Sequence, residues 1–118
     1  PVIVPMGLDE KGMSYNINAD TAAGAIARSI KSRRLMLLTD IDGVLDNNDK
    51  LISEINTMEA KELINNEVIH GGMIPKVKTC IDAINNGVRA VVIIDGRKPH
   101  SILFELFSDK GAGTLIRK

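Results

Sequence analysis

The chain has 118 residues, which is the size of one domain and enough to enclose a hydrophobic core. Its 15 Lys and Arg residues balance 15 Asp and Glu residues, so nothing suggests a strongly charged surface for nucleic acid or a membrane. No apolar run approaches the roughly 20 residues that span a bilayer. The lone Cys80 excludes an internal disulfide, and its helical spacing from apolar neighbours predicts a small core side chain. We therefore expect a soluble, cytoplasmic protein whose residues 1–118 form one domain.

The amino-terminal segment predicts two short extended pieces followed by a helix. Val2–Val4 lies between prolines and predicts a strand, and a polar turn separates it from a second piece at 14–17. From Asp20 the apolar spacing becomes helical, and the small residues over 19–27 favour a helix that lies close to a sheet or a ligand. The chain begins with proline in place of Met. Methionine removal and excision from a longer chain are both compatible with that start.

The middle of the chain predicts a strand and two helices. Leu35–Thr39 is a continuous apolar run, which is typical of a strand buried on both faces of a parallel sheet, and a polar loop over 40–50 follows it. A helix is expected after Thr57, ending at residues 65–66. A second helix should follow Gly71 and Gly72, with Pro75 in its first turn, where a missing N–H does no harm.

The last third predicts a buried strand over 90–94, a short helix over 102–107 and a final strand over 114–116. Strands that alternate with helices indicate an α/β fold with a largely parallel sheet sandwiched by helices. In such sheets ligands bind beyond the carboxyl ends of the strands, which points to residues 40–43 and 95–97.

Polar groups gather where the first helix is expected to begin. Asn16, Asn18 and Asp20 alternate, and in an extended segment residues two apart point the same way, so all three would face one cleft. Taken singly, Asp20 is equally well explained as a helix cap, and the asparagines are ordinary turn formers.

Lys76 is the first lysine after the double glycine that opens the later helix. Backbone N–H groups, the positive end of the helix dipole and an ammonium group can converge there on a phosphate. The spacing is not that of the Walker motif, and a solvated lysine is the alternative. An acid and a base at two helix starts supply the positioning and charge compensation that phosphoryl transfer needs.

A rival interpretation rests on Asp40 and Asp42. A hydrophobic strand ending in Asp-x-Asp-Gly is how phosphatases of the haloacid-dehalogenase type present their nucleophile and magnesium ligands. Those enzymes need further carboxylates after a later strand, and here that strand supplies only Asp95. His70 and His100 have no partners at metal-ligand spacing and are predicted to be surface or capping residues.

Five segments of the chain form a set of spaced motifs: Tyr15–Ala23, Leu37–Leu45, Gly71–Lys76, Ile94–Arg97 and Gly111–Thr114. Taken together and in order, they resemble the carboxyl-terminal half of the N-acetylglutamate kinases, within the amino-acid kinase family. The resemblance covers the chain from Pro1 to Lys118, and the spaced motifs in register make it specific. It implies an amino-acid-kinase fold in which this lobe binds ATP and the other lobe binds the acylated amino acid.

The resemblance also implies roles for single residues. Asn16 would contact N-acetyl-L-glutamate, Asp20 would hold the catalytic lysines, and Lys76 would neutralise charge on the transferring phosphoryl group. ATP with Mg²⁺ would be used in the second step of arginine biosynthesis, with the substrate γ-carboxylate as nucleophile and no covalent intermediate. The full-length protein is expected to be a homo-oligomer. The residues implied at the nucleotide site are Thr39, Asp40, Asp42, Gly43, Val44, Leu45, Gly72 and Lys76.

Two departures from the family pattern bear on activity. The glycine-rich turn with a second catalytic lysine, and the arginine that grips the substrate, are not within these 118 residues, so we expect an isolated lobe that is inactive alone. Glu105 and Gly111 resemble effector-site residues of members that L-arginine inhibits, although a frequent histidine of those members is Val92 here. Another amino-acid kinase, acting on a different carboxylate or on carbamate, and a regulatory nucleotide-binding domain stay open as alternatives.

Overall fold

Four strands form the central sheet of the computed structural model, which describes residues 1–118 throughout. The strand order is β3-β5-β6-β4. β3–β5 and β4–β6 pair in parallel, whereas β5–β6 is antiparallel. The prediction of a largely parallel sheet is therefore confirmed, with one antiparallel pair at its centre. The strands are β3 (Arg34–Thr39), β4 (Glu54–Asn56), β5 (Ala90–Asp95) and β6 (Gly113–Arg117).

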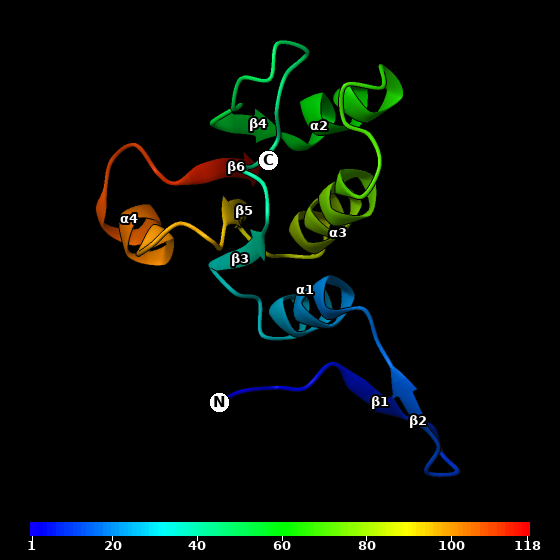
Figure 1. Ribbon diagram of the computed structural model, residues 1–118. Coiled ribbons are helices and arrows are strands. Elements are labelled where there is room, and N and C mark those ends of the chain that lie inside the picture. Colours follow the sequence, from blue (N-terminus) through cyan, green and yellow to red (C-terminus); the bar gives the residue numbers. More distant parts are fainter.

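Helices cover both faces of this sheet, as expected (Figure 1). α1 (Ala19–Ser29), α2 (Thr57–Asn65) and α3 (Met73–Asn85) lie on one side, and α4 (Ser101–Phe107) lies on the other. The most deeply buried strand is β5, because it sits between two strands and between two helical layers. Its run Val91–Ile94 has no exposed surface.

α3 begins and buries its apolar face as its sequence predicts. It begins directly after Gly72, carries Pro75 in its first turn and buries Val77, Cys80, Ile81 and Ile84. Burial disfavours the charged thiolate and raises the pKa of Cys80 to about 12, as befits an inert core side chain. α2 is fixed at its start by a capping box, in which the side chains of Asn56 and Glu59 each accept from the other residue's backbone N–H.

The amino terminus differs from its prediction. Val2–Val4 is exposed and forms no strand; the first strand is β1 (Met6–Leu8), which pairs antiparallel with β2 (Ser14–Asn16) in a hairpin that projects from the body (Figure 1). Proline lacks a backbone N–H, so Pro5 joins the hairpin only as an acceptor, from the backbone N–H of Ile17 at 2.9 Å, and the paired residues begin at Met6. The carboxylate of Asp9 accepts hydrogen bonds from the backbone N–H groups of Lys11 and Met13, both at 2.9 Å, and so shapes the turn.

β3 is a second correction. The run Leu35–Thr39 does form a strand, but it is an edge strand that pairs only with β5. Leu37 is buried in the core, whereas Leu38, which points to the other face of the sheet, is 47% exposed. The short β4 escaped prediction because its three residues carry one apolar side chain, Ile55. No helix of the structure has both the length and the apolar character required to cross a membrane.

Candidate functional site

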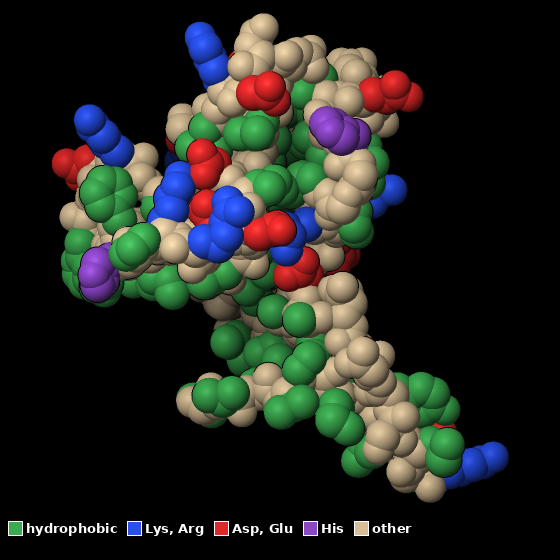
Figure 2. Space-filling model, viewed as in Figure 1, with side chains coloured by type: hydrophobic (Ala, Val, Ile, Leu, Met, Phe, Trp, Pro, Cys, Tyr) green, Lys and Arg blue, Asp and Glu red, His purple; other side chains and the backbone are tan.

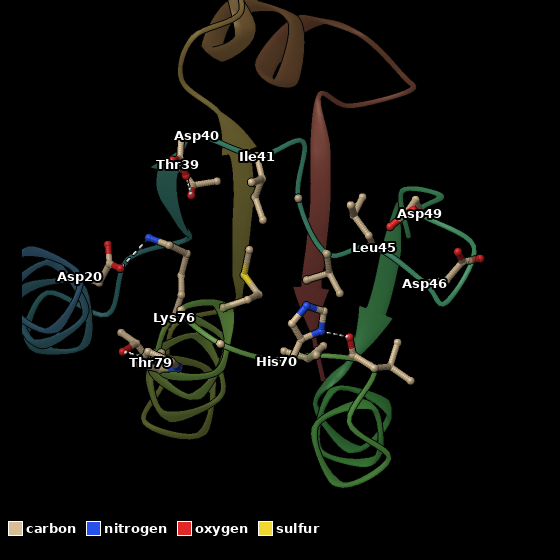
Figure 3. Close-up of a pocket in the computed structure, with 18 of the residues that line it drawn as sticks. Asp20, Thr39, Asp40, Ile41, Leu45, Asp46, Asp49, His70, Lys76 and Thr79 are labelled. Carbon is tan, nitrogen blue, oxygen red and sulfur yellow. Dashed lines mark hydrogen bonds and ion pairs between the residues drawn. The ribbon is translucent and has the colours of Figure 1, made fainter.

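A cavity of about 930 Å³ lies beyond the carboxyl end of β3 (Figure 3). α1 and α3 supply one side, and the loop over 40–50 supplies the other. Figure 3 shows Asp20 and Lys76 on one side and Asp46 and Asp49 on the opposite side. The wall consists of Asn18, Asp20, Thr21, Thr39, Asp40, Ile41, Gly43, Val44, Leu45, Asp46, Asp49, Val68, Ile69, His70, Gly71, Gly72, Met73, Pro75, Lys76 and Thr79.

The acid and the base predicted at two helix starts meet in this cavity. Lys76 Nζ lies 2.6 Å from Asp20 Oδ2, and the two side chains are 14% and 27% exposed. The packing of α1 against α3 brings them together, although they are 56 residues apart. A charge pair this short fixes the direction of the lysine side chain. The remaining donors of the ammonium group stay available to an anion in the cavity.

The expected alternation of Asn16, Asn18 and Asp20 into one cleft is wrong. The extended segment ends at Asn16, and α1 begins at Ala19, so the three residues do not share one strand. Asn18 caps the helix by accepting from the backbone N–H of Thr21 at 3.1 Å, which leaves Asp20 within the first turn. Asn18 and Asp20 reach the cavity, whereas Asn16 is exposed in the hairpin outside its wall.

The start of α3 is open toward the cavity. Gly71 has a positive φ of 56°, which favours glycine, and no side chain caps the helix at Gly72. A Cβ at Gly72 would meet nothing within 4 Å. An uncapped helix start carries partial positive charge, which Lys76 reinforces. His70 lies at the same edge, exposed, with Nδ1 3.2 Å from the carbonyl oxygen of Val68.

The loop beyond β3 brings predicted and unpredicted residues to the cavity. Of the residues expected at the nucleotide site, Thr39, Asp40, Gly43, Val44 and Leu45 line this cavity. Asp46 and Asp49 were not predicted, because no local pattern distinguishes them from turn residues. Asp46 Oδ1 accepts from the backbone N–H groups of residues 48 and 50, at 2.8 and 3.0 Å, and these bonds lower the pKa of its carboxyl.

The other charged residues at this end of the sheet pair with one another outside the cavity wall. Asp42 Oδ1 lies 2.6 Å from Lys98 Nζ. Asp95 is 2% exposed and accepts from Arg97 at Nε (3.0 Å), Nη2 (2.9 Å) and the backbone N–H (2.9 Å). These bonds lower the pKa of Asp95 to about 2. Figure 2 shows acidic and basic side chains intermingled near the centre of this view.

This pairing separates the residues that a haloacid-dehalogenase-type phosphatase would need. Asp95 is committed to Arg97, and Asp42 to Lys98, so neither carboxylate joins Asp40. The structure contains no group of three or more His, Cys, Asp or Glu side chains that could hold a metal ion. The expectation that residues 95–97 line the ligand site is not met: of the two predicted segments, only 40–43 contributes to the cavity wall, through Asp40, Ile41 and Gly43.

Glu105 and Gly111, the two predicted effector residues, lie together on the opposite side of the sheet. Glu105 is 9% exposed; Oε2 accepts from the backbone N–H of Ala112 at 2.8 Å, and Oε1 accepts from Arg34 Nη1 at 3.2 Å. Gly111 has φ +68°, and a Cβ there would lie 2.9 Å from Glu105 Oε2. A groove of about 690 Å³ beside α4 includes Gly111 and Ala112.

Comparison with known proteins identifies the family. The model of the amino acid kinase family matches residues 1–95. The chain belongs to the amino acid kinase family. It is 64% identical over 118 residues to the acetylglutamate kinase of Pelagibacter ubique and 56% identical over 117 residues to that of Rhodospirillum rubrum. These matches take in 100% and 99% of this chain but 41% and 38% of the relatives, so the chain spans about two fifths of their length.

Solved structures confirm the amino-acid-kinase-like α/β fold. An N-acetylglutamate synthase from Neisseria gonorrhoeae, complexed with coenzyme A and L-arginine, superposes with a TM-score of 0.91 at 29% identity, over 97% of this chain and 26% of that one. A carbamate kinase from Giardia lamblia, bound to citric acid, gives 0.74 at 27% identity, over 96% of this chain and 36% of that one. Similar folds therefore occur in proteins named as a synthase and as kinases.

Proposed function

We propose that residues 1–118 are the ATP-binding part of an acetylglutamate kinase, which transfers the γ-phosphoryl group of ATP to the γ-carboxylate of N-acetyl-L-glutamate in arginine biosynthesis. The observation that carries the proposal is the Lys76–Asp20 pair, 2.6 Å apart in the wall of a cavity that the open start of α3 also lines. The 64% identity to an acetylglutamate kinase supports this substrate over others.

Each cavity group has a part in the transfer. The positive start of α3 at Gly71 and Gly72 binds phosphate oxygens, and Lys76 compensates charge on the transferring group. Asp20 keeps the ammonium group in place between the two helices. The substrate carboxylate attacks the γ-phosphorus as the bond to the β-phosphate oxygen breaks and ADP leaves, so this chain supplies charge and position and no nucleophile.

The loop wall at 43–45 is proposed to hold the nucleotide. The backbone there is fixed against β6, and Leu45 offers an apolar surface to the cavity. Asp42, also expected at the nucleotide site, pairs with Lys98 outside the wall, so its proposed role is to support the loop.

Magnesium fits this site as a companion of the nucleotide. Mg²⁺ usually keeps waters and phosphate oxygens as ligands and takes only one or two protein carboxylates, so a three-carboxylate cage is not required. Asp40 is exposed in the cavity wall and forms no salt bridge, which makes it the proposed protein ligand. When bound, the ion would neutralise charge on the phosphates.

The remaining roles concern the whole protein. Asn16 is proposed to contact acetylglutamate from the hairpin, and the whole protein is proposed to form a homo-oligomer. We propose that these 118 residues bind ATP but do not transfer phosphate alone. ADP release that depends on acetylglutamate, from the purified chain, would contradict this.

L-Arginine inhibition is proposed as a second property of the whole protein. Glu105 and Gly111, which the resemblance implies at the effector site, lie together beside the groove next to α4. The Neisseria gonorrhoeae synthase of similar fold is described as a complex with L-arginine. Calorimetry on the whole protein should show heat on addition of arginine, and no heat would remove the proposal.

The test of the kinase proposal is a graft. Residues 1–118 would replace the matching segment of the Pelagibacter ubique acetylglutamate kinase, and the product would be assayed with ATP and acetylglutamate. We expect phosphorylation of acetylglutamate, its loss with Lys76→Ala, and partial retention with Asp40→Asn. A folded graft that phosphorylates carbamate or another acid instead would refute the substrate. Phosphate-ester hydrolysis that survives Lys76→Ala but not Asp40→Asn would favour a phosphatase.

A further inference from the structure

The hydroxyl group of Thr114 joins both arms of the loop that walls the cavity. The backbone N–H of Val44 donates to Thr114 Oγ1 at 2.8 Å, and the same hydroxyl donates to the carbonyl oxygen of Ile52 at 2.7 Å. Thr114 lies in β6 and has no exposed surface. One atom of a central strand therefore bonds to both ends of the segment 44–52.

The backbone of the loop lies directly on this hydroxyl. A Cβ built on Gly43 would lie 2.6 Å from Thr114 Oγ1 and 2.8 Å from Leu51 Cδ1, and φ at Gly43 is +147°. Glycine is needed at this position both for space and for conformation. The close approach explains how Val44, which is 1% exposed, can reach the strand.

The other bonds of the loop run within it. Ile52 N–H donates to the carbonyl oxygen of Val44 at 2.9 Å, and Leu45 forms an isolated bridge with Leu51. These contacts hold the two arms to each other. The later arm is also held to β6 just beyond Ile52, where the backbone N–H of Leu115 donates to the carbonyl oxygen of Ser53 at 2.9 Å, whereas the Val44 arm meets β6 through the Thr114 hydroxyl. Thr114 itself is firmly placed, because β6 pairs with β5 on one side and β4 on the other. Its hydroxyl thus holds the loop in a fixed position relative to the sheet.

We propose that Thr114 is a positioning residue for the nucleotide, one that sets the 43–45 wall without lining the cavity itself. The proposal rests on the proposed function, since it assumes that this wall receives ATP. A buried hydroxyl in a strand could serve packing alone. The difference is that a positioning role predicts weaker nucleotide binding when the hydroxyl is lost, even when the protein stays folded.

The test compares three variants of the 118-residue chain. Thr114→Val keeps the shape but removes the hydroxyl, Thr114→Ser keeps the hydroxyl, and Ile116→Val trims the same buried strand away from the loop. Thermal unfolding first shows which variants are folded. For each folded variant, calorimetry measures the affinity for ADP, and NMR measures the rate of amide hydrogen exchange at Val44. We expect Thr114→Val to weaken ADP binding roughly tenfold and to speed exchange at Val44 at least as much, because buried partners lose their bond. Thr114→Ser and Ile116→Val should stay within about threefold of the parent in both measurements.

The outcomes test two claims: that the Thr114 hydroxyl fixes the loop, and that the loop so fixed positions the nucleotide. Unchanged exchange at Val44 in Thr114→Val overturns the inference that this hydroxyl fixes the loop. Faster exchange with unchanged ADP affinity overturns its role in positioning the nucleotide. A parent chain that binds no ADP overturns the proposed function and the nucleotide role together, while the exchange data still decide whether Thr114 fixes the loop.

Discussion

Replacing Lys76 by methionine removes the cation that the proposal assigns to the phosphates while keeping most of the side-chain volume. The Lys76 side chain is 14% exposed, and a hydrogen bond to a charged group has a net worth of about 1.5–3 kcal/mol. Asp20, 2.6 Å away, already cancels part of this charge, so we take the lower part of the range, about 1.5–2 kcal/mol. That free energy corresponds to a roughly tenfold to thirtyfold weaker affinity for ATP.

Calorimetric titration of the chain with a non-hydrolysable ATP analogue measures this change. Lys78→Met is the matched control, because Lys78 is exposed two residues further along α3, in a groove beside α2 and outside the cavity. The control should bind like the parent chain. An affinity for the analogue that Lys76→Met leaves within threefold of the parent would refute the reasoning.

Asp20→Asn should not weaken nucleotide binding as Lys76→Met does, because it removes a negative charge in place of a positive one. The carboxylate lies in the cavity wall and repels phosphate oxygens, so its loss should leave the affinity for the analogue equal or a few-fold tighter. Phosphoryl transfer in the graft should nevertheless fall, because Lys76 loses the partner that orients it. Loss of nucleotide affinity in Asp20→Asn would show that the acid contributes to binding rather than to orientation.

Three further predictions concern stability and reactivity. Asp95 has a pKa of about 2 in the folded chain, below its ordinary value of 3.8, so its pairing with Arg97 stabilises the fold above about pH 4 and is lost as the pH falls toward 2. Urea unfolding should therefore show that the loss of unfolding free energy caused by Asp95→Asn shrinks between pH 4 and pH 2. A loss that stays constant over this range would contradict the prediction. Gly113→Ala would place a Cβ 2.0 Å from the carbonyl oxygen of Ile93 and should destabilise the fold by more than about 3 kcal/mol, whereas Gly72→Ala should change it by less than about 1 kcal/mol. Cys80 is buried with its pKa raised, so a thiol reagent at pH 8 should label the unfolded chain but not the native one, and rapid native labelling would count against its placement.

The elements with long periodic signals could be predicted from the sequence. α3 has four buried residues at helical spacing between a double glycine and Asn86, and β5 is an unbroken apolar run that ends at Asp95. β4 could not be predicted, because one apolar residue in three carries no period. The antiparallel direction of β6 relative to β5 could not be predicted from the sequence either, because it depends on how the connection through α4 crosses the sheet.

The site residues that could be predicted are those that lie directly after a strand or at the start of a helix. Lys76 follows a double glycine and Asp40 follows the apolar run of β3, and both positions are visible in the sequence. The error at Asn16 came from extending the strand pattern past the helix cap at Asn18. Thr114 gave only a weak signal, a hydroxyl within an apolar strand, because its two partners are 70 and 62 residues away along the chain.

The most direct measurement is an NMR titration of the labelled chain with a non-hydrolysable ATP analogue and Mg²⁺. We expect the largest shifts at the backbone amides of Gly71 and Gly72 and along 43–45, together with a shift of the Lys76 side-chain signal. Shifts confined to the groove beside α4, or no shifts at millimolar analogue, would contradict the claim that this cavity receives the nucleotide phosphates.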